Sequence, residues 1–117
     1  MTGAFSLRSS AAAAADLQST AASFGFAFGS TPAATYIPAA GPTTTACAGS
    51  AAAPTATSGN VCVYEAASTN VSGTPCVFST AAATITCNSA SRFGFGIQVT
   101  PAAVGDVSLW GSWAATG

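Results

Sequence analysis

Side chains able to act as acids, bases or nucleophiles are scarce in this sequence of 117 residues. It has no histidine and no lysine, so the commonest general base and the residue that forms Schiff bases are both missing. The acids are Asp16, Glu65 and Asp106, and their spacing does not predict the facing carboxylates that glycoside hydrolysis requires. Glu65, at the end of a predicted strand, is expected to be solvated or paired with an arginine. We therefore expect no catalytic residue, no cofactor and no enzyme activity.

The four cysteines, Cys47, Cys62, Cys76 and Cys87, are the other reactive side chains. Zinc sites usually contain a C-x-x-C pair or nearby histidines, and neither occurs here, so no metal site is expected. Two disulfides in an oxidising compartment fit the spacing better, although four cysteines allow three pairings. We predict the two local pairings, Cys47–Cys62 and Cys76–Cys87. Each should contribute about 3 kcal/mol to stability by the loop-entropy relation.

A hairpin register supports the second of these disulfides. Segments 76–79 and 84–87 flank a short connection and are predicted to pair as antiparallel strands. Residues directly opposite one another in such a pair have Cβ atoms close enough for a disulfide. Counting inward from the two cysteines gives the expected partners Val77 and Thr86, Phe78 and Ile85, and Ser79 and Thr84.

The composition predicts a surface with very little charge. Charged residues make up 4% of the chain, against about 25% in an ordinary domain. Such a surface does little to oppose self-association, so we expect a homo-oligomer, with a trimer favoured, or a larger assembly. Arg8 and Arg92 are too few to form a binding surface for nucleic acid or anionic lipid. No long apolar run predicts membrane insertion, and Ala11–Ala15 is interpreted as mature protein rather than a signal peptide.

Alternation of apolar with small or polar residues predicts seven or eight strands. The length suits one domain, residues 1–117, with an all-β fold that is an antiparallel β-sandwich or is jelly-roll-like. The first and last strands are expected to pair. Two loops are predicted, a long disulfide-pinned loop over 39–60 and a second over 66–75. The predicted strands cover 3–10, 19–29, 34–37, 61–65, 76–79, 84–87, 91–100 and 107–116.

Segment 9–18 is ambiguous by pattern. Its five consecutive alanines favour a helix by propensity. However, no apolar stripe accompanies them, so we favour the end of a strand followed by a turn of small residues.

Two Phe-Gly-Phe patterns indicate where the core lies. Phe24, Phe26 and Phe28 alternate with small residues and need a large apolar surface opposite them. A core position is favoured for these rings over a carbohydrate-stacking platform. Phe93 and Phe95 repeat the pattern, so the two segments are expected to share one core.

Three other aromatic residues are candidates for an interface or a ligand contact. Trp110 alternates with Trp113 along the last strand, so its side chain is expected on the opposite face. Tryptophan on a surface often anchors contacts. Tyr36 and Tyr64 are the other two candidates.

Five short motifs stand out in the sequence: Tyr36-Ile-Pro38, Cys47-Ala-Gly49, Asn60-Val-Cys-Val-Tyr-Glu65, Ala90-Ser-Arg-Phe-Gly-Phe95 and Gly111-Ser-Trp-Ala-Ala115. Together they resemble small globular domains of actinobacterial secreted proteins and of phages that infect those hosts. Such domains often end collagen-like or other fibre-forming chains. The resemblance extends from about Gly3 to Thr116 and implies no catalytic residues. This chain lacks the collagen-like repeat, and its pair Cys76 and Cys87 is an addition to the pattern.

These features together lead us to expect a non-enzymatic structural or adhesive domain that associates with itself. We expect it outside the cell, on a cell surface or a virion, as a fibre head or decoration-type domain. The alternative is a lectin-like module that binds a carbohydrate or another surface ligand through exposed aromatic residues and the loop 39–60.

Overall fold

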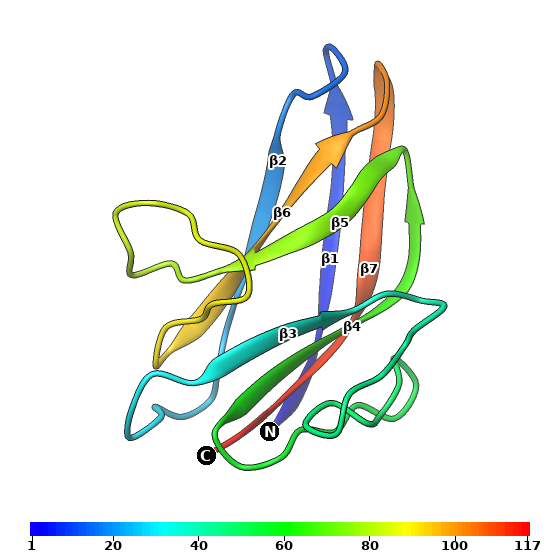
Figure 1. Ribbon diagram of the computed structural model, residues 1–117. Coiled ribbons are helices and arrows are strands. Elements are labelled where there is room, and N and C mark those ends of the chain that lie inside the picture. Colours follow the sequence, from blue (N-terminus) through cyan, green and yellow to red (C-terminus); the bar gives the residue numbers. More distant parts are fainter.

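The computed structural model, which describes all residues 1–117, is an all-β sandwich of seven strands. One sheet has the order β1-β7-β4-β3 and the other the order β2-β6-β5 (Figure 1). The predicted fold class is therefore confirmed, with seven strands rather than eight. The strands are β1 (Thr2–Ala11), β2 (Gln18–Ser23), β3 (Ala33–Ile37), β4 (Asn60–Thr69), β5 (Val71–Phe78), β6 (Gly94–Pro101) and β7 (Gly105–Thr116).

The pairing of the strands differs from the prediction in one place. β1 pairs with β7, as expected, and every neighbouring pair is antiparallel except β3 and β4, which are parallel. Parallel neighbours need a long connection that brings the chain back to its starting end. The segment 38–59 is that connection, and its length is explained by the parallel pairing.

The core lies between the two sheets and follows the predicted alternation. It is a cluster of 18 buried residues, to which β6 contributes Phe95, Ile97 and Val99 and β7 contributes Leu109 and Trp113. Phe93 was expected on the same face as Phe95, but it lies before β6 begins and is 61% exposed. The two ends of the chain lie at the same end of the sandwich, where the Met1 ammonium donates to Ala115 O (Figure 1).

The prediction of a strand over 19–29 is wrong for its second half. β2 ends at Ser23, yet Phe24 and Phe28 are both buried in the core. Their ring centroids lie 5.4 Å apart, whereas residues four apart in a strand are separated by about 13 Å. The chain therefore curls so that both rings reach the core, where Phe24 also contacts Phe95, as the shared-core hypothesis required.

Segment 66–75 is not a loop. β4 continues to Thr69 in one sheet, β5 begins at Val71 in the other, and Asn70 alone makes the turn between them. Asn70 has φ 59°, a left-handed conformation that asparagine tolerates better than most residues. Its side-chain amide donates to Ala103 O and accepts from Ala103 N–H, so the turn is held from both sides.

Both predicted disulfides are present, Cys47–Cys62 and Cys76–Cys87, although the hairpin register is wrong. Segment 84–86 is not a strand, and Cys87 pairs with Phe78 through an isolated bridge. Ser89 N–H donates to Val77 O, while the Ser89 hydroxyl donates to Thr86 O. The chain is therefore folded into a turn where a second strand was expected.

No free cysteine remains. Two disulfides indicate an oxidising, extracellular environment. The structure contains no helix with the length and hydrophobicity needed to cross a membrane. Segment 12–17 is a turn and irregular chain after β1, in agreement with the preferred interpretation of the alanine run.

Candidate functional site

The long connection 38–59, here called the cap, folds over the outer face of β4. Along β4, Val61 and Val63 point into the core, while Cys62 and Tyr64 point away from it. All four are nevertheless buried, because the cap covers the outward pair. The cap and the sheet thus form a second small cluster made of Ile37, Cys47, Cys62 and Tyr64, with Ala46, Ala51 and Ala56 packed against it.

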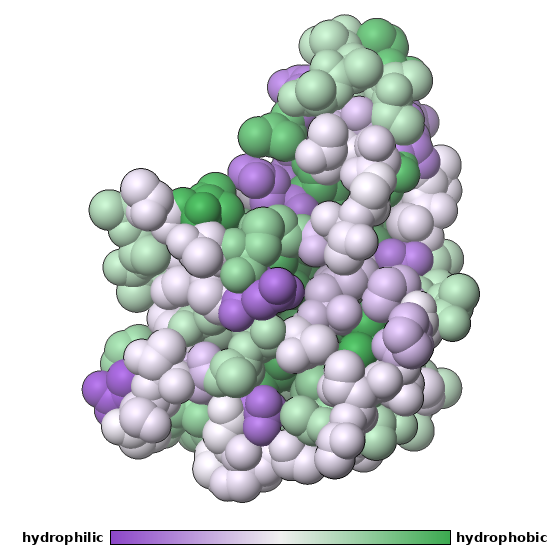
Figure 2. All heavy atoms as spheres, viewed as in Figure 1, coloured by the Kyte–Doolittle hydropathy of each residue, from purple (hydrophilic) through white to green (hydrophobic).

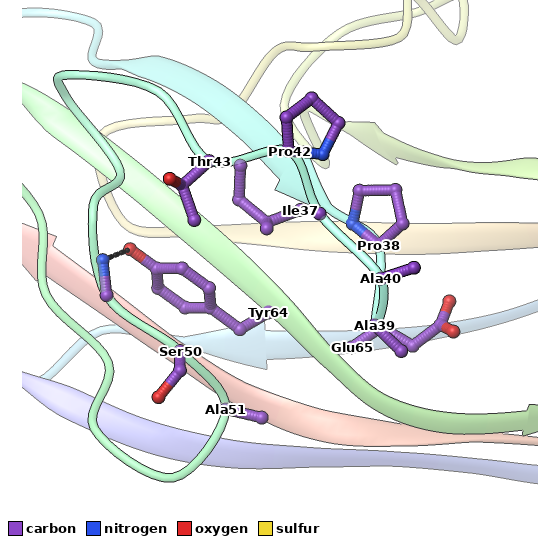
Figure 3. Close-up of a pocket in the computed structure, with 12 residues that line it drawn as sticks. Ile37, Pro38, Ala39, Ala40, Pro42, Thr43, Ser50, Ala51, Tyr64 and Glu65 are labelled. Atoms are coloured by element: carbon purple, nitrogen blue, oxygen red, sulfur yellow. Dashed lines mark hydrogen bonds between the residues drawn. The ribbon is translucent and has the colours of Figure 1, made fainter.

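One disulfide and several hydrogen bonds hold the cap in place. Cys47 of the cap is bonded to Cys62 of β4, with the Cα atoms 5.5 Å apart. The Tyr64 hydroxyl donates to Thr55 O at 2.5 Å and accepts from Gly49 N–H at 3.0 Å (Figure 3). From β7, the Ser112 hydroxyl donates to Ala51 O at 2.7 Å. The predicted pinned loop is therefore a fixed layer with its own packing.

Two hollows adjoin where the cap meets the sheet, and together we call them the cap groove. The first, the Tyr64 hollow, has a volume of about 330 Å³ and the second, the Trp110 hollow, about 470 Å³. The Tyr64 hollow is lined by residues 37–43 and 49–51 with Tyr64 and Glu65. The Trp110 hollow is lined by residues 50–52 with Ala39, Glu65, Ala66 and Trp110. The two hollows share Ala39, Ser50, Ala51 and Glu65 in their linings, so they lie directly next to each other.

Glu65 lies at the junction of the two hollows. The ladder between β4 and β7 shifts register between Glu65 and Ala67, so β4 bulges at this point. Gly111 of β7 faces the bulge, and a Cβ atom there would lie 1.9 Å from Tyr64 O. The close approach of the two backbones therefore requires glycine. Figure 3 shows the Glu65 carboxylate beside Ala39 and Ala40, with the Tyr64 ring at the other side of the hollow.

The Glu65 carboxylate is held by hydroxyl groups and not by an arginine. The buried Tyr36 hydroxyl donates to Glu65 Oε1 at 2.6 Å, and the Ser68 hydroxyl is 3.5 Å from Oε2. Arg92, by contrast, donates from Nε to Phe28 O. Burial raises the pKa of Tyr36 far above its usual value near 10, and the bond to Glu65 and the charge of Glu65 raise it further. Tyr36 is therefore a neutral donor that orients the carboxylate.

Trp110 forms the exposed wall of the groove. It lies in the central strand β7 with its side chain 47% exposed on the outer face of the sheet, as the alternation with Trp113 predicted. Its cross-strand neighbours are Ser6 on β1 and Ala67 on β4. These small neighbours leave the indole uncovered, while β7 keeps its position fixed.

The three aromatic candidates are thus placed differently from one another. Trp110 is exposed at the groove, whereas Tyr36 is 7% and Tyr64 1% exposed, so neither tyrosine ring offers a face to a ligand. Their hydroxyls instead orient Glu65 and fasten the cap. The disulfide between Cys47 of the cap and Cys62 of β4 is buried between the cap and the sheet, and neither Cys76 nor Cys87 lines the groove.

Glu65 is a groove residue that no sequence pattern indicated. The expected surroundings of its side chain were solvent or an arginine, and the structure shows a tyrosine partner instead. The alternation of β4 gave no sign of a groove at Glu65, because the residues that complete the groove come from the cap. The cap residues that form the other wall are alanine, glycine, proline, serine and threonine, and they carry no recognisable motif.

No protein-family model matches this chain, and neither a curated protein nor a solved structure gives a significant match. The resemblance to actinobacterial and phage fibre domains stays a prediction from the motifs. The groove itself is therefore the basis for the functional proposal.

Proposed function

We propose that this chain is a non-enzymatic adhesive domain, displayed outside the cell or on a virion, that holds a surface ligand in the cap groove. The observation that carries the proposal is Trp110, which is 47% exposed on a central strand and forms one wall of the groove. Tryptophan is among the residues that contribute most to binding at interfaces, since it offers a large contact area. Its position on a strand, rather than a loop, means that little freedom is lost on binding.

The rigidity of the cap supports a binding role. Cys47–Cys62, the Tyr64 hydroxyl and the Ser112 hydroxyl each fix the cap to the sheet. A groove whose walls are already in place does not have to be ordered when a ligand arrives. An adhesive domain needs such a preformed site, because it holds its ligand by non-covalent contacts alone.

The side chains lining the groove also support binding without catalysis. Glu65 is the only carboxylate among them, and no histidine, lysine or cysteine accompanies it. A glycosidase uses two carboxylates, and a hydrolase of the serine or cysteine type uses a nucleophile beside a base. The groove brings together neither set.

The nature of the surface supports display in an extracellular assembly. Figure 2 shows one face of the molecule as mostly pale and green, with purple confined to a few residues. A chain with two disulfides and so little charge suits a fibre head or a decoration-type domain, as the resemblance to fibre-associated domains implies.

A cell-adhesion measurement tests this proposal. Fluorescent beads coated with the protein are incubated with actinobacterial cells, and the retained beads are counted against beads coated with the Trp110→Ala variant. We expect retention to fall at least fivefold for the variant. Equal retention of the two would contradict a role of the cap groove in adhesion.

Self-association through the same face is the second candidate function. The surface around Trp110 is formed by small uncharged side chains, Ser6 and Ala67, and does little to repel a second copy. Light scattering without reductant should then give a trimer or another stable oligomer, and Trp110→Ala should dissociate it. A monomeric native protein would reject this candidate, and an oligomer that survives the substitution would exclude Trp110 from its interface.

A further inference from the structure

We propose that the ligand of the cap groove is a neutral oligosaccharide, with one sugar ring stacked on Trp110 and the hydroxyls of a neighbouring ring donating to Glu65. This inference rests on the proposed function, because it uses the same groove, and it names the chemistry of the ligand. It follows from four properties of the groove: its aromatic wall, its carboxylate, its charge and its length.

The first property is the shape and chemistry of the Trp110 hollow. Its volume of about 470 Å³ falls within the range of about 300–1,000 Å³ typical of small-molecule sites. Apart from the indole and Glu65, its walls are alanine and serine side chains. A pyranose ring has an apolar C–H face that can lie on an indole and a polar rim of hydroxyls, so it matches an aromatic wall beside hydrogen-bond acceptors.

The second property is the carboxylate of Glu65, a residue that lines both hollows. An ionised carboxylate is purely an acceptor, with room for about four hydrogen bonds on its two oxygens. Tyr36 occupies one of these at 2.6 Å, and the contact of Ser68 with Oε2 is long at 3.5 Å. The remaining acceptor positions call for a ligand that donates hydrogen bonds, and adjacent sugar hydroxyls are such donors.

The third property is the absence of positive charge from the groove. No arginine lines either hollow, so a uronic acid, sialic acid or phosphate would meet the Glu65 charge without compensation. A cationic ligand would be attracted by Glu65, but sites for ammonium groups usually surround the cation with several aromatic faces. Trp110 is the one exposed aromatic side chain here, since Tyr64 is 1% exposed. A neutral ligand with hydroxyl donors is therefore the best match.

The fourth property is the presence of two adjoining hollows, both of which include Glu65 in their lining. The Trp110 hollow lies on one side, and the Tyr64 hollow extends on the other beside Pro38 and Pro42 (Figure 3). A single sugar ring cannot occupy both hollows, whereas a chain of sugars can pass from one to the other. The ligand is accordingly an oligosaccharide or an internal stretch of a polysaccharide.

The test is a calorimetric titration with tetrasaccharides that differ in charge. Neutral probes are cellotetraose, maltotetraose, mannotetraose and N-acetylated chitotetraose. The deacetylated chitotetraose is the matched cationic probe, and tetragalacturonate is the anionic one. We expect at least one neutral tetrasaccharide to bind and the two charged ones to bind at least tenfold more weakly.

Three variants place the binding in the groove. Trp110→Ala should lower the association constant at least tenfold, and Glu65→Gln at least threefold because charge-assisted hydrogen bonds are lost. Phe93→Ala is the matched control, because Phe93 is also exposed (61%) but lines a separate hollow beside Arg92. It should leave the affinity unchanged. Near-ultraviolet circular dichroism checks that each variant is folded.

Each result separates this inference from the proposed function. If no neutral tetrasaccharide binds at millimolar concentration while Trp110→Ala still abolishes cell adhesion, the ligand is not a neutral saccharide although the adhesive function stands. Preferential binding of the cationic probe overturns the inference in the same way. Saccharide binding that is unaffected by Trp110→Ala places the site elsewhere and overturns it too. If the native protein neither binds a saccharide nor adheres to cells, both proposals are rejected together.

Discussion

Removal of the disulfide beneath the cap should cost more stability than removal of the other disulfide. Cys47 and Cys62 are 15 residues apart, and a loop of that length corresponds to about 3 kcal/mol of chain entropy. Both cysteines are fully buried in the small cluster with Ile37 and Tyr64, so two alanines in their place also leave a void. Deletion of buried atoms adds about 1–2 kcal/mol here. We expect Cys47→Ala/Cys62→Ala to lower the free energy of unfolding by about 4–5 kcal/mol.

The control is the Cys76→Ala/Cys87→Ala variant. Its cysteines are 11 residues apart, which gives nearly the same entropy, about 3 kcal/mol. Because Cys87 is exposed, its replacement by alanine leaves no buried void. The loss in the free energy of unfolding should therefore stay near the entropic value of about 3 kcal/mol. Urea denaturation at 25 °C gives both free energies, and hydrogen exchange should show faster exchange of cap amides in the first variant alone. Equal losses in the two variants, or unchanged exchange in the cap, would refute this account of how the cap is held.

Three further changes have expected outcomes. Gly111→Ala should lower the free energy of unfolding by about 2–3 kcal/mol, since the new methyl would meet Tyr64 O at 1.9 Å; an unaltered urea midpoint would contradict this. Burial raises the pKa of Tyr36 in the folded protein above its value in the unfolded chain. Below pH 10 the hydroxyl is neutral in both states, so the free energy of unfolding does not depend on its titration there. Above pH 10 this free energy should fall by about 1.4 kcal/mol per pH unit, and Tyr36→Phe should abolish that slope in denaturation measurements at pH 9–11.5. Trp110→Ala should change stability by less than about 1 kcal/mol, because the side chain is half exposed; a larger loss would mean that it serves mainly to stabilise the sheet.

The alternation of apolar residues was sufficient to predict the strands that contain it without interruption. In β7, Leu109 and Trp113 face the core and Trp110 faces outward, as the period of two requires. The pairing Cys47–Cys62 was also predictable, because the two cysteines are close in sequence and a disulfide between them fixes a long loop rich in proline and alanine. Cys76–Cys87 was predicted correctly from a register that the structure does not show, since Cys87 pairs with Phe78. Short sequence separation therefore gave a better guide than the count along the hairpin.

Features that depend on tertiary structure were not predictable. Phe24 and Phe28 have the spacing of a strand, but the chain curls so that Phe28 packs on Phe24, which itself contacts Phe95 and Trp113 in the core. The parallel pairing of β3 with β4 depends on where the cap returns the chain. The groove followed from neither composition nor motif, because most of its lining comes from small cap residues that form no recognisable motif.

The measurement that tests the central claim most directly is an NMR titration of the two indole N–H groups. The chain contains two tryptophans, Trp110 at the groove and Trp113 in the core, so a ¹⁵N-labelled sample gives two indole signals. Trp110→Phe assigns them by removing one. As a neutral tetrasaccharide is added, we predict that the Trp110 signal shifts to saturation while the Trp113 signal stays in place. Signals that both remain unmoved at millimolar saccharide would contradict the claim that the cap groove is a saccharide-binding site.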